Sequence, residues 1–452
     1  MDLKRPFLAL RESIAGEPGL LRLTSFLLLA VVITVGVTTD VALLRFKGLL
    51  RTVANDSAPS VELAGLIRES LAEMDADAVN GFLPGAPKEA FGEFGDHRNQ
   101  AVNLLVRAAG NVTYGEAELV PIRALISGLT TYTGLVQTAH EMEYPGGIPI
   151  QFRASQLMTQ QLLPAGEELD RANFKPLEAS TDYAATHDFS LGLNISGWAL
   201  VVLLAVVQIV VGVRFHRVIN PALFAAFLLT LTLILYLDTR LADTKTLMTG
   251  AVDEAFASVH ALSKAKALAG NANGDESLYI LASGDRVSQA LYEDSFKQKI
   301  GHLISTPITS RVRDQFATAI DRNEKAPYDG YVADALNNVT FPGEDKLALA
   351  MLDALKRYLE IDERVRELER SGQHAKAIEL CLGDDPGQSN YAFAEFRNAL
   401  DALSKLNQRV FEERMATAQL RLRNDEIGGT ILVAIVALLS FVGLRPRIKE
   451  FA

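Results

Sequence analysis

Four long runs without a charged residue constrain this chain more than any other feature of its sequence. They occupy residues 23–39, 189–213, 218–237 and 427–444, and contain 17, 25, 20 and 18 residues. A helix needs about 20 apolar residues, within a range of ~17–25, to cross the hydrocarbon layer of a membrane. Because all four runs meet this length, the sequence predicts an integral membrane protein with four transmembrane helices. The first run is longer than the apolar part of a typical signal peptide, so we expect it to remain as an anchor.

The distribution of charge predicts the orientation. With four spans, the short segments 1–22, 214–220 and 445–452 share one side, and they hold nine basic and four acidic residues. The positive-inside rule makes that side the cytoplasm. We therefore expect a multi-pass protein of the cell membrane with both termini cytoplasmic. Its transmembrane helices are placed at 23–39, 191–213, 221–237 and 427–444, and its large extracytoplasmic domains at 40–190 and 238–426.

The charge balance also excludes one class of partner. The whole chain has a net charge of −11, and the short segments together carry +5, which leaves −16 for the two large outer segments. An acidic surface repels the phosphate backbone of nucleic acids. We therefore expect the lipid bilayer, and no nucleic acid, among the partners.

The two large segments are related to each other in sequence. A shift of 198 residues aligns several residues of the first segment with identical residues of the second. With small gaps the order continues to the end of both segments. The aligned pairs include Asp40 and Asp238, Lys47 and Lys245, Asp77 and Asp275, Asn111–Thr113 and Asn338–Thr340, Tyr132 and Tyr358, Arg153 and Arg397, and Asp188 and Asp425. Such self-similarity indicates an internal duplication, in which each unit is a span, an outer domain and a second span.

The outer domains are predicted to be helical bundles. Apolar residues recur at helical spacing in both copies, for example from Leu43 through Phe46, Leu50 and Val53, as in amphipathic helices. We expect an all-α fold with two duplicated extracytoplasmic antiparallel bundles of four main helices each. A kink or break is expected at Pro59. The Asn-Val-Thr stretches have the form of glycosylation acceptors, but we interpret them as equivalent connections between the second and third helices of the two copies.

No catalytic or metal-binding pattern is found, so we expect no enzyme activity and no cofactor. Asp75 and Asp77 form an Asp-x-Asp pair, which we interpret as a solvated helix surface and not as a metal site. Cys381 is the single cysteine, which excludes an intrachain disulfide. It lies in an apolar helical pattern and is interpreted as a buried, unreactive thiol.

Two sets of arginines are candidate binding residues. Arg153 and Arg397 recur at equivalent positions of the two copies, and an arginine at such a position binds a carboxylate ligand bidentately, forms a fixed ion pair within the bundle or is simply exposed. The second set lies in the short cytoplasmic segments, where it is a candidate contact for a cytoplasmic protein or only a determinant of topology. Its members are Arg214, Arg217, Arg445 and Arg447.

Three stretches carry a resemblance to a known family: residues 132–169, residues 214–224 and the ending 443–451. They resemble the four-span bacterial GlnX proteins, which are associated with an amino-acid-binding lipoprotein (GlnH) outside the cell and a soluble Ser/Thr kinase (PknG) inside it. The resemblance implies a receptor-like coupler, with the loaded lipoprotein docking on the outer bundles and the spans relaying its state to the kinase.

The sequence thus favours a transmembrane signal coupler in nutrient sensing of glutamate, aspartate or glutamine. One alternative is an envelope scaffold or assembly factor that sends no signal. A second is a sensor that binds its ligand directly, as chemotaxis receptors do with four-helix sensor domains. The sequence leaves the ligand and the oligomeric state, including a homo-oligomer, open.

Overall fold

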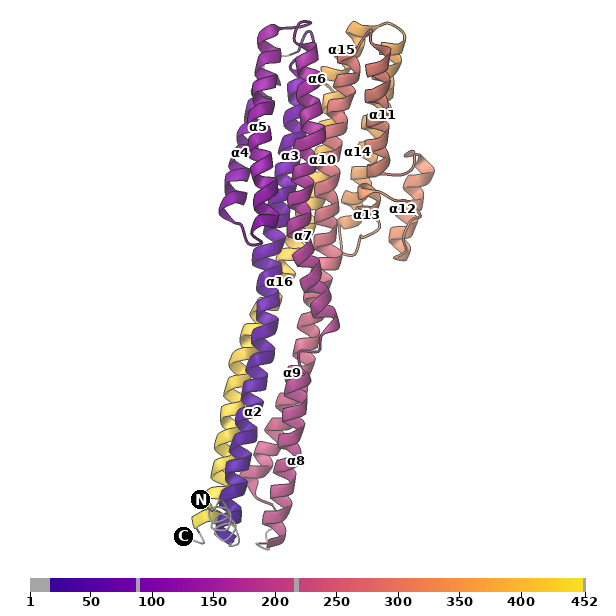
Figure 1. Cartoon of the computed structure of the whole chain (residues 1–452). Helices are drawn as coiled ribbons and strands as arrows, with labels where there is room; N and C mark the ends of the chain where they lie inside the picture. The colour runs from indigo at the N-terminus through magenta and orange to yellow at the C-terminus, as the bar shows by residue number, and fades with distance from the viewer. Residues whose placement is uncertain (1–16, 87–89, 215–218, 450–452) are drawn as a thin grey trace. The chain divides into compact units, whose positions relative to one another are not determined.

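The computed structural model describes residues 17–86, 90–214 and 219–449, and within these ranges every regular element is a helix. The predicted all-α fold class is therefore confirmed (Figure 1). The elements in chain order are α2 (Glu17–Arg51), η1 (Thr52–Ser57), α3 (Ala58–Asn80), α4 (Ala90–Gly110), α5 (Glu116–Met142), α6 (Ile148–Leu157), η2 (Met158–Leu162), α7 (Leu163–Thr186), α8 (Leu191–Arg214), α9 (Pro221–Gly250), η3 (Ala251–Phe256), α10 (Ala257–Leu281), α11 (Arg286–Leu303), α12 (Ser310–Arg322), α13 (Tyr331–Leu336), α14 (Glu344–Arg370), α15 (His374–Leu382) and α16 (Ser389–Lys449).

The chain divides into two compact units. Unit 1 consists of Met1–Thr52, Ser180–Thr249 and Arg414–Ala452, and unit 2 of Val53–Ala179 and Gly250–Glu413. Helix α16 and the helical run from α2 through η1 to α3 each contribute residues to both units. The division therefore cuts across single helices.

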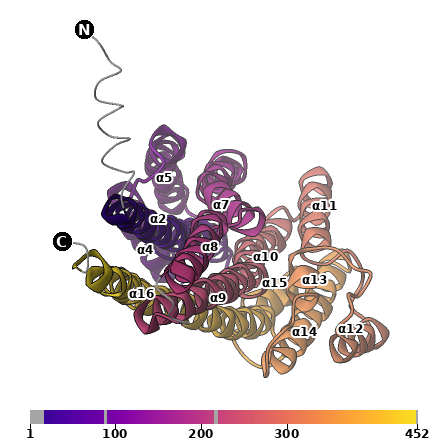
Figure 2. The same cartoon turned by 90° about the horizontal axis from the view of Figure 1, so that it is seen from below.

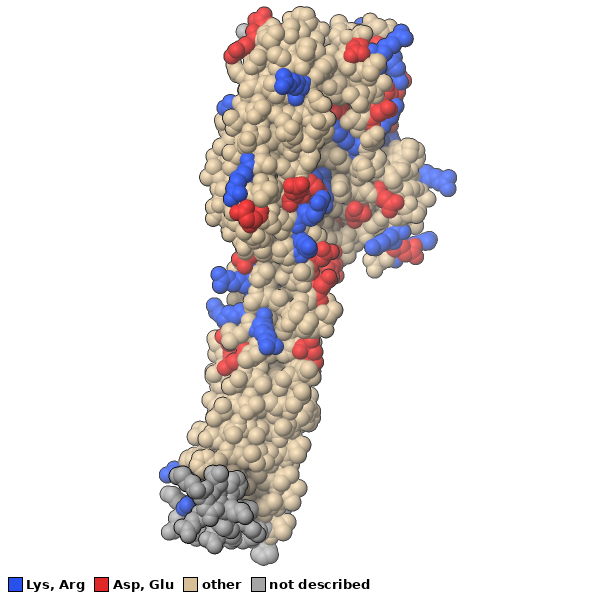
Figure 3. Space-filling view, viewed as in Figure 1, with Lys and Arg blue, Asp and Glu red and all other residues tan. Residues whose placement is uncertain are grey.

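Unit 1 has an apolar interior and an apolar exterior. Helices α2, α8, α9 and α16 lie side by side (Figure 2) and enclose a core that includes Leu28, Leu200, Leu233 and Val436. Their outward positions are also apolar, since Phe26 is 72% exposed and Val213 is 73% exposed. Figure 3 shows a stretch of this surface without any Lys, Arg, Asp or Glu on the face in view. A soluble protein rarely exposes an apolar surface of this extent, whereas a lipid-facing one does.

Five helical stretches of the described chain are long and apolar enough to cross a membrane. Four of them, Arg22–Asn80, Ile148–Val213, Pro221–Leu281 and Ser389–Pro446, contain the four predicted spans, and their most apolar 18-residue windows have mean hydropathies of 2.0 to 2.5. The fifth is α5, whose corresponding window has a mean hydropathy of 1.3. Its apolar stripe, which includes Leu125, Leu129 and Val136, is buried in the core of unit 2. Packing against neighbouring helices thus accounts for its apolar residues.

Polar side chains inside unit 1 are hydrogen-bonded between helices. The hydroxyls of Thr38 on α2 and Ser196 on α8 lie 2.7 Å apart. Asn194 donates to Asp238 Oδ1 over 3.0 Å, and Tyr236 donates to Asp425 Oδ1 over 2.8 Å. Because a polar group in an apolar interior is costly without a partner, these pairs favour one arrangement of the four helices.

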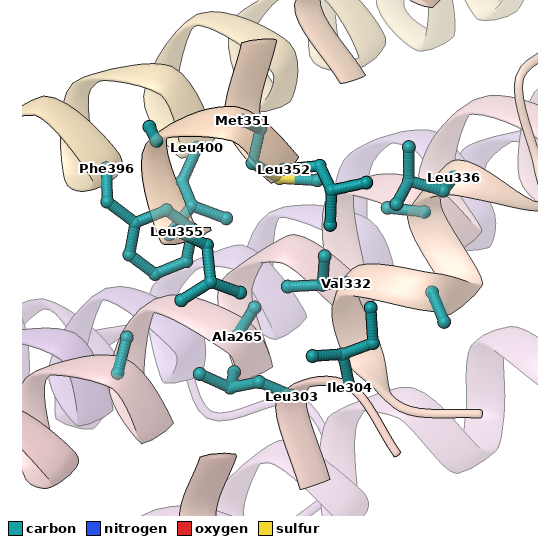
Figure 4. Close-up of a cluster of buried hydrophobic side chains, with 14 of the residues drawn as sticks. Ala265, Leu303, Ile304, Val332, Leu336, Met351, Leu352, Leu355, Phe396 and Leu400 are labelled. Carbon is teal, nitrogen blue, oxygen red and sulfur yellow. The ribbon is translucent and has the colours of Figure 1, made fainter. Parts of the chain in front are cut away.

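Unit 2 contains two helical bundles. The first bundle is built from α3, α4, α5 and the run α6–η2–α7, around a core that includes Ile67, Leu71 and Leu125. The second bundle is built from α10, α11, α13, α14 and the unit 2 part of α16. Its core includes Leu303, Leu355, Phe396 and Leu400 (Figure 4).

The second bundle departs from the four main helices predicted. Its second-helix region is split into α11, α12 and α13, and α15 follows α14. Figures 1 and 2 show α12 at the edge of the bundle, where it packs against α14. Helix α11 ends at Leu303, where Ile304 is extended, and α12 ends at Arg322, where Asn323 adopts the left-handed conformation typical of a helix C-terminus.

The break predicted at Pro59 is not observed. The helix passes through the π-helical segment η1 and continues into α3, with proline in its first turn. A second π-helical segment, η3, occupies the corresponding place before α10, where the sequence has no proline. Proline is therefore not the common cause of these segments.

The two Asn-Val-Thr stretches lie in connections, as predicted, between α4 and α5 and between α13 and α14. Asn111 Nδ2 donates to Ser60 Oγ over 3.2 Å, and Asn338 Nδ2 donates to Ser258 Oγ over 2.9 Å. Ser60 and Ser258 are 198 positions apart, so the shift that aligns the two segments also aligns these two contacts. Asn338 Nδ2 also reaches the carbonyls of Asp253 (3.2 Å) and Glu254 (2.7 Å). Each asparagine thus ties a connection to the first helix of its own bundle.

These contacts generate a stability prediction. We expect Asn338→Ala to lower the free energy of unfolding by about 1–3 kcal/mol and Asn111→Ala by about 0.5–1.5 kcal/mol, because the first substitution removes three hydrogen bonds and the second removes one. The check is thermal unfolding of the full chain in detergent, followed by circular dichroism. Asn103→Ala, on the exposed face of α4, is the control. Equal effects of all three substitutions would contradict the prediction.

Candidate functional site

The first helices of the two bundles pack against each other in register. A Cβ on Gly65 would lie 2.0 Å from Ser263 Oγ, one on Gly270 would lie 3.3 Å from Ala72 Cβ, and one on Gly274 would lie 3.6 Å from Ala76 Cα. Residue numbers in each pair differ by 198. Helices α3 and α10 therefore run parallel, and the shift that aligns the two sequences also aligns the two helices. We call this contact the seam.

Buried carboxyl groups lie on both helices of the seam. Asp75 Oδ1 accepts hydrogen bonds from Tyr132 (2.8 Å) and Ser155 (3.0 Å). Glu276 accepts from Tyr358 (3.0 Å) and Ser389 (2.8 Å). Burial raises the pKa of Asp75 to about 6 and the pKa of Glu276 to about 8. Each bundle thus directs the hydroxyl of one of the aligned tyrosines at a carboxyl group of its first helix.

The interpretation of Asp75 and Asp77 as a solvated surface is wrong. Asp75 is 1% exposed, and Asp77 Oδ2 lies 2.6 Å from His97 Nδ1 of α4. The physical reason is that α3 is enclosed on several sides, by its own bundle and by α10. Asp75 is therefore buried, and Asp77, on a different face, is half-buried and paired with His97.

A chain of charged groups links α16 to α3 and α4. Arg397 lies 2.6 Å from Glu73 Oε1, and His97 Nε2 lies 2.9 Å from Glu73 Oε2. Hydrogen bonds to Asp77 and Glu73 raise the pKa of His97 to about 10. Burial alone would raise the pKa of Glu73, but its contacts with His97 and Arg397 outweigh burial and lower it. Arg397, on the second bundle, is therefore paired with a carboxylate of the first.

A groove, here called groove A, lies on one flank of the seam between α4 and α16 and has a volume of about 340 Å³. Its polar lining includes Glu62 and Glu69 from α3, Lys266 from α10, and Asp401 and Gln408 from α16. Lys266 is paired with Asp401, and its Nζ lies 3.9 Å from Glu69. Burial is the main cause that raises the pKa of Glu69 to about 7.

A second groove, groove B, has a volume of about 310 Å³ and is lined by α3, η2, α7, α10, α11 and α13. Arg68 of α3 lines it, 2.8 Å from Glu167 of α7. Arg68 and Lys266 are equivalent under the shift of 198, so each groove has a cation at the same position of a seam helix. Lys264 approaches both Glu167 and Asp170 at 3.8 Å, so the charges around groove B balance.

The predicted site residues lie elsewhere. Arg153 is exposed on α6, and neither it nor Arg397 lines groove A or groove B. Arg445 is exposed on α16. Arg217 lies outside the described residues, as do the side chains of Arg214 and Arg447. Cys381 is buried as predicted, and burial raises the pKa of its thiol well above the usual value.

The raised pKa of Glu276 predicts a pH dependence of stability. The pKa is about 8 in the folded chain against 4.5 for a free glutamate. The folded state thus prefers the protonated carboxyl, and the stabilisation is complete below pH 4.5 and lost as the pH rises through about 8. We expect Glu276→Gln to match the wild type in melting temperature at pH 5 and to exceed it at pH 9. Exposed Glu360→Gln is the control, and a constant difference at all pH values would contradict this prediction.

Comparison with known proteins links the first bundle to sensing. A family model described as "Actinobacterial sensor domain" matches residues 49–182, which contain α3 to α6 and most of α7. No curated protein matches the chain, and no solved structure does. The matched region supplies α3, with Glu69, Asp75 and one side of the seam. The match and the apolar helices fit a bacterial sensor protein and are compatible with a membrane location.

Proposed function

We propose that this chain is a four-span membrane sensor without enzyme activity. Unit 1 would contribute the spans, with both termini and the α8–α9 connection in the cytoplasm, and unit 2 the sensing domains outside. The apolar exterior of unit 1 and the basic short segments support this topology. Helix α5 is assigned to unit 2 because its apolar face is already covered in the first bundle. Among the described residues, no group of His, Cys, Asp or Glu has the geometry of a metal site.

The two bundles are proposed to be copies of one duplicated unit. Support comes from the aligned asparagine–serine contacts, the aligned tyrosines that donate to buried carboxyl groups, and the pairing of equivalent positions across the seam. A duplicated pair that packs along its first helix has the arrangement of a parallel dimer fused into one chain.

The observation that carries the signalling proposal is the seam. Its two helices continue through η1 and η3 into the apolar helices α2 and α9. Glycine, alanine and serine make the closest contacts of the seam, so a small slide or rotation of α3 against α10 requires little repacking at those positions. Shifts of about 1–2 Å between packed helices are an established means of transmitting a signal.

The partners are proposed from the resemblance to GlnX proteins. Outside the membrane the input would be the amino-acid-binding lipoprotein loaded with glutamate, aspartate or glutamine. Inside it the output would reach a soluble Ser/Thr kinase, as the resemblance implies, and the connection 214–220 is too short to form a domain of its own. Direct binding of a ligand is the second candidate input, and grooves A and B favour it.

Locking the seam tests signalling against the scaffold alternative. The Cβ positions of residues 72 and 270 are 3.3 Å apart, close to the ~3.5–4.5 Å that a disulfide requires. We expect the oxidised Ala72→Cys/Gly270→Cys variant to lose the change in Ser/Thr phosphorylation that follows an amino-acid pulse in cells. Each single variant should respond normally, and a reductant should restore the response. A normal response in the oxidised double variant would favour a scaffold.

The cytoplasmic arginines provide a separate test of the output. Arg217→Lys and Arg447→Lys keep the charge that sets topology but remove the planar guanidinium. If these residues contact the kinase, we expect in-cell cross-linking from the 214–220 loop to capture several-fold less of it, with unchanged amounts of the protein in the membrane. If the amount of captured kinase is unchanged, Arg217 and Arg447 serve only to set the topology.

A further inference from the structure

A groove opens between α2 and α16 in unit 1. A Cβ on Gly36 would lie 3.2 Å from Val433 Cγ1, so the two helices come close at this level. About one turn further, toward the N-terminus of α2 and the C-terminus of α16, they enclose a cavity of about 240 Å³. It is lined by residues within 22–32 of α2 and 437–441 of α16. We call this cavity the leaflet groove.

The lining of the leaflet groove is mostly apolar and reaches the outside of unit 1. Leu28 and Val32 are buried and form its floor. Phe26 and Phe441 are 72% and 62% exposed and form its rims, one on each helix. The groove therefore opens on the apolar exterior of unit 1, which faces lipid hydrocarbon in the proposed topology.

The length of the leaflet groove matches one leaflet of a bilayer. Its lining on α2 extends from Arg22 to Val32, which is ~15 Å along a helix that rises ~1.5 Å per residue. The hydrocarbon core of a bilayer is ~30 Å thick. Val32 lies in the middle of the uncharged run 23–39, and Arg22 directly precedes that run. The groove therefore extends from the cytoplasmic headgroup region to the middle of the membrane.

The cytoplasmic end of the leaflet groove is positively charged. Arg22 lines the groove and is exposed, and Arg445 is exposed on α16, about one turn beyond Phe441. Neither helix has an Asp or Glu within residues 18–39 or 427–449. The short cytoplasmic segments together carry +5. This end of the groove is therefore complementary to an anionic headgroup, which the cytoplasmic leaflet supplies.

We propose that the leaflet groove binds an acyl chain of an anionic phospholipid of the cytoplasmic leaflet, with the headgroup phosphate at Arg22. The inference rests on the four-span topology proposed above and adds a specific lipid ligand to it. Bound there, the lipid contacts α2, which continues into the first bundle, and α16, which comes from the second. A second copy of the chain fits the groove less well. Copies in one membrane share an orientation, so it would bring its own basic end to the same level, where like charges repel.

The test is a titration of the delipidated full chain in detergent, with bound lipids counted by native mass spectrometry. The probes are phosphatidylglycerol and phosphatidylcholine with identical acyl chains. We expect the wild type to bind phosphatidylglycerol more tightly. Arg22→Gln should weaken this binding about 5-fold, the effect of one basic residue near an anionic surface, and leave phosphatidylcholine binding unchanged. Arg22→Lys should keep the preference. Arg51→Gln, which removes an exposed charge at the other end of α2, is the control.

A second substitution tests the acyl-chain part of the groove. Ala437→Leu partly fills the groove and leaves its basic end intact, so we expect it to weaken the binding of both lipids several-fold. Ala434→Leu, at an exposed position of the same helix, is the matched control and should change neither. Because Arg22→Gln affects one lipid and Ala437→Leu affects both, a general loss of folding cannot produce the two results together.

Three results would overturn the proposal: equal binding of the two lipids by the wild type, a preference that survives Arg22→Gln, or binding that Ala437→Leu does not change. A dimer in the same spectra that Ala437→Leu dissociates would also overturn it and assign the groove to a second copy. If lipid binding fails but the locked seam variant loses its response, the sensing function stands. If the lipid binds as expected but the locked variant responds normally, only the signalling function is refuted.

Discussion

The close approach of α3 and α10 is the constraint on which the rest of unit 2 depends. Glycine and alanine on both helices bring the two backbones together and leave little side-chain surface to bury at the contact. The helices are therefore surrounded by their own bundles, and polar groups on them lie in the interior. Asp75 and Glu276 are tolerated there because each accepts two hydroxyl hydrogen bonds and because burial keeps the carboxyl partly or largely protonated near neutral pH.

The features that were predictable from sequence are those that depend on patterns within one segment or on the shift of 198. The apolar runs, the helical periodicity and the shift of 198 are local or repeated patterns, and they predicted an all-α chain and two related outer segments. Burial of Asp75 was not predictable, because it depends on Tyr132 of α5 and Ser155 of α6, 57 and 80 positions away, which donate to a carboxyl group on a face of α3 that looks polar in isolation. The grooves escaped prediction for a related reason. Their residues come from four or more helices, and no spacing within one helix identifies them as lining one groove. The one sequence signal is the shift of 198, which pairs Arg68 with Lys266.

Differences between the aligned positions give the two flanks of the seam different properties. Arg68 meets Glu167 at 2.8 Å, whereas its counterpart Lys266 meets Asp401 and leaves Glu69 at 3.9 Å. The position that the shift of 198 aligns with Glu69 is Ala267, so this carboxylate has no counterpart at the aligned position of α10. The two flanks of the seam therefore differ in their charged groups.

This asymmetry bears on how a signal would arise. Burial raises the pKa of Glu69 first, and the acidic neighbours Glu73 and Asp401 raise it further, whereas Lys266 and Arg397 lower it. Glu73 belongs to the first bundle and Asp401 to the second, so this repulsion acts between α3 and α16 within unit 2. Arg397, on the same helix as Asp401, is paired with Glu73 and opposes that repulsion. The contact between α3 and α16 therefore depends on the protonation of Glu69, a dependence that the other flank of the seam lacks.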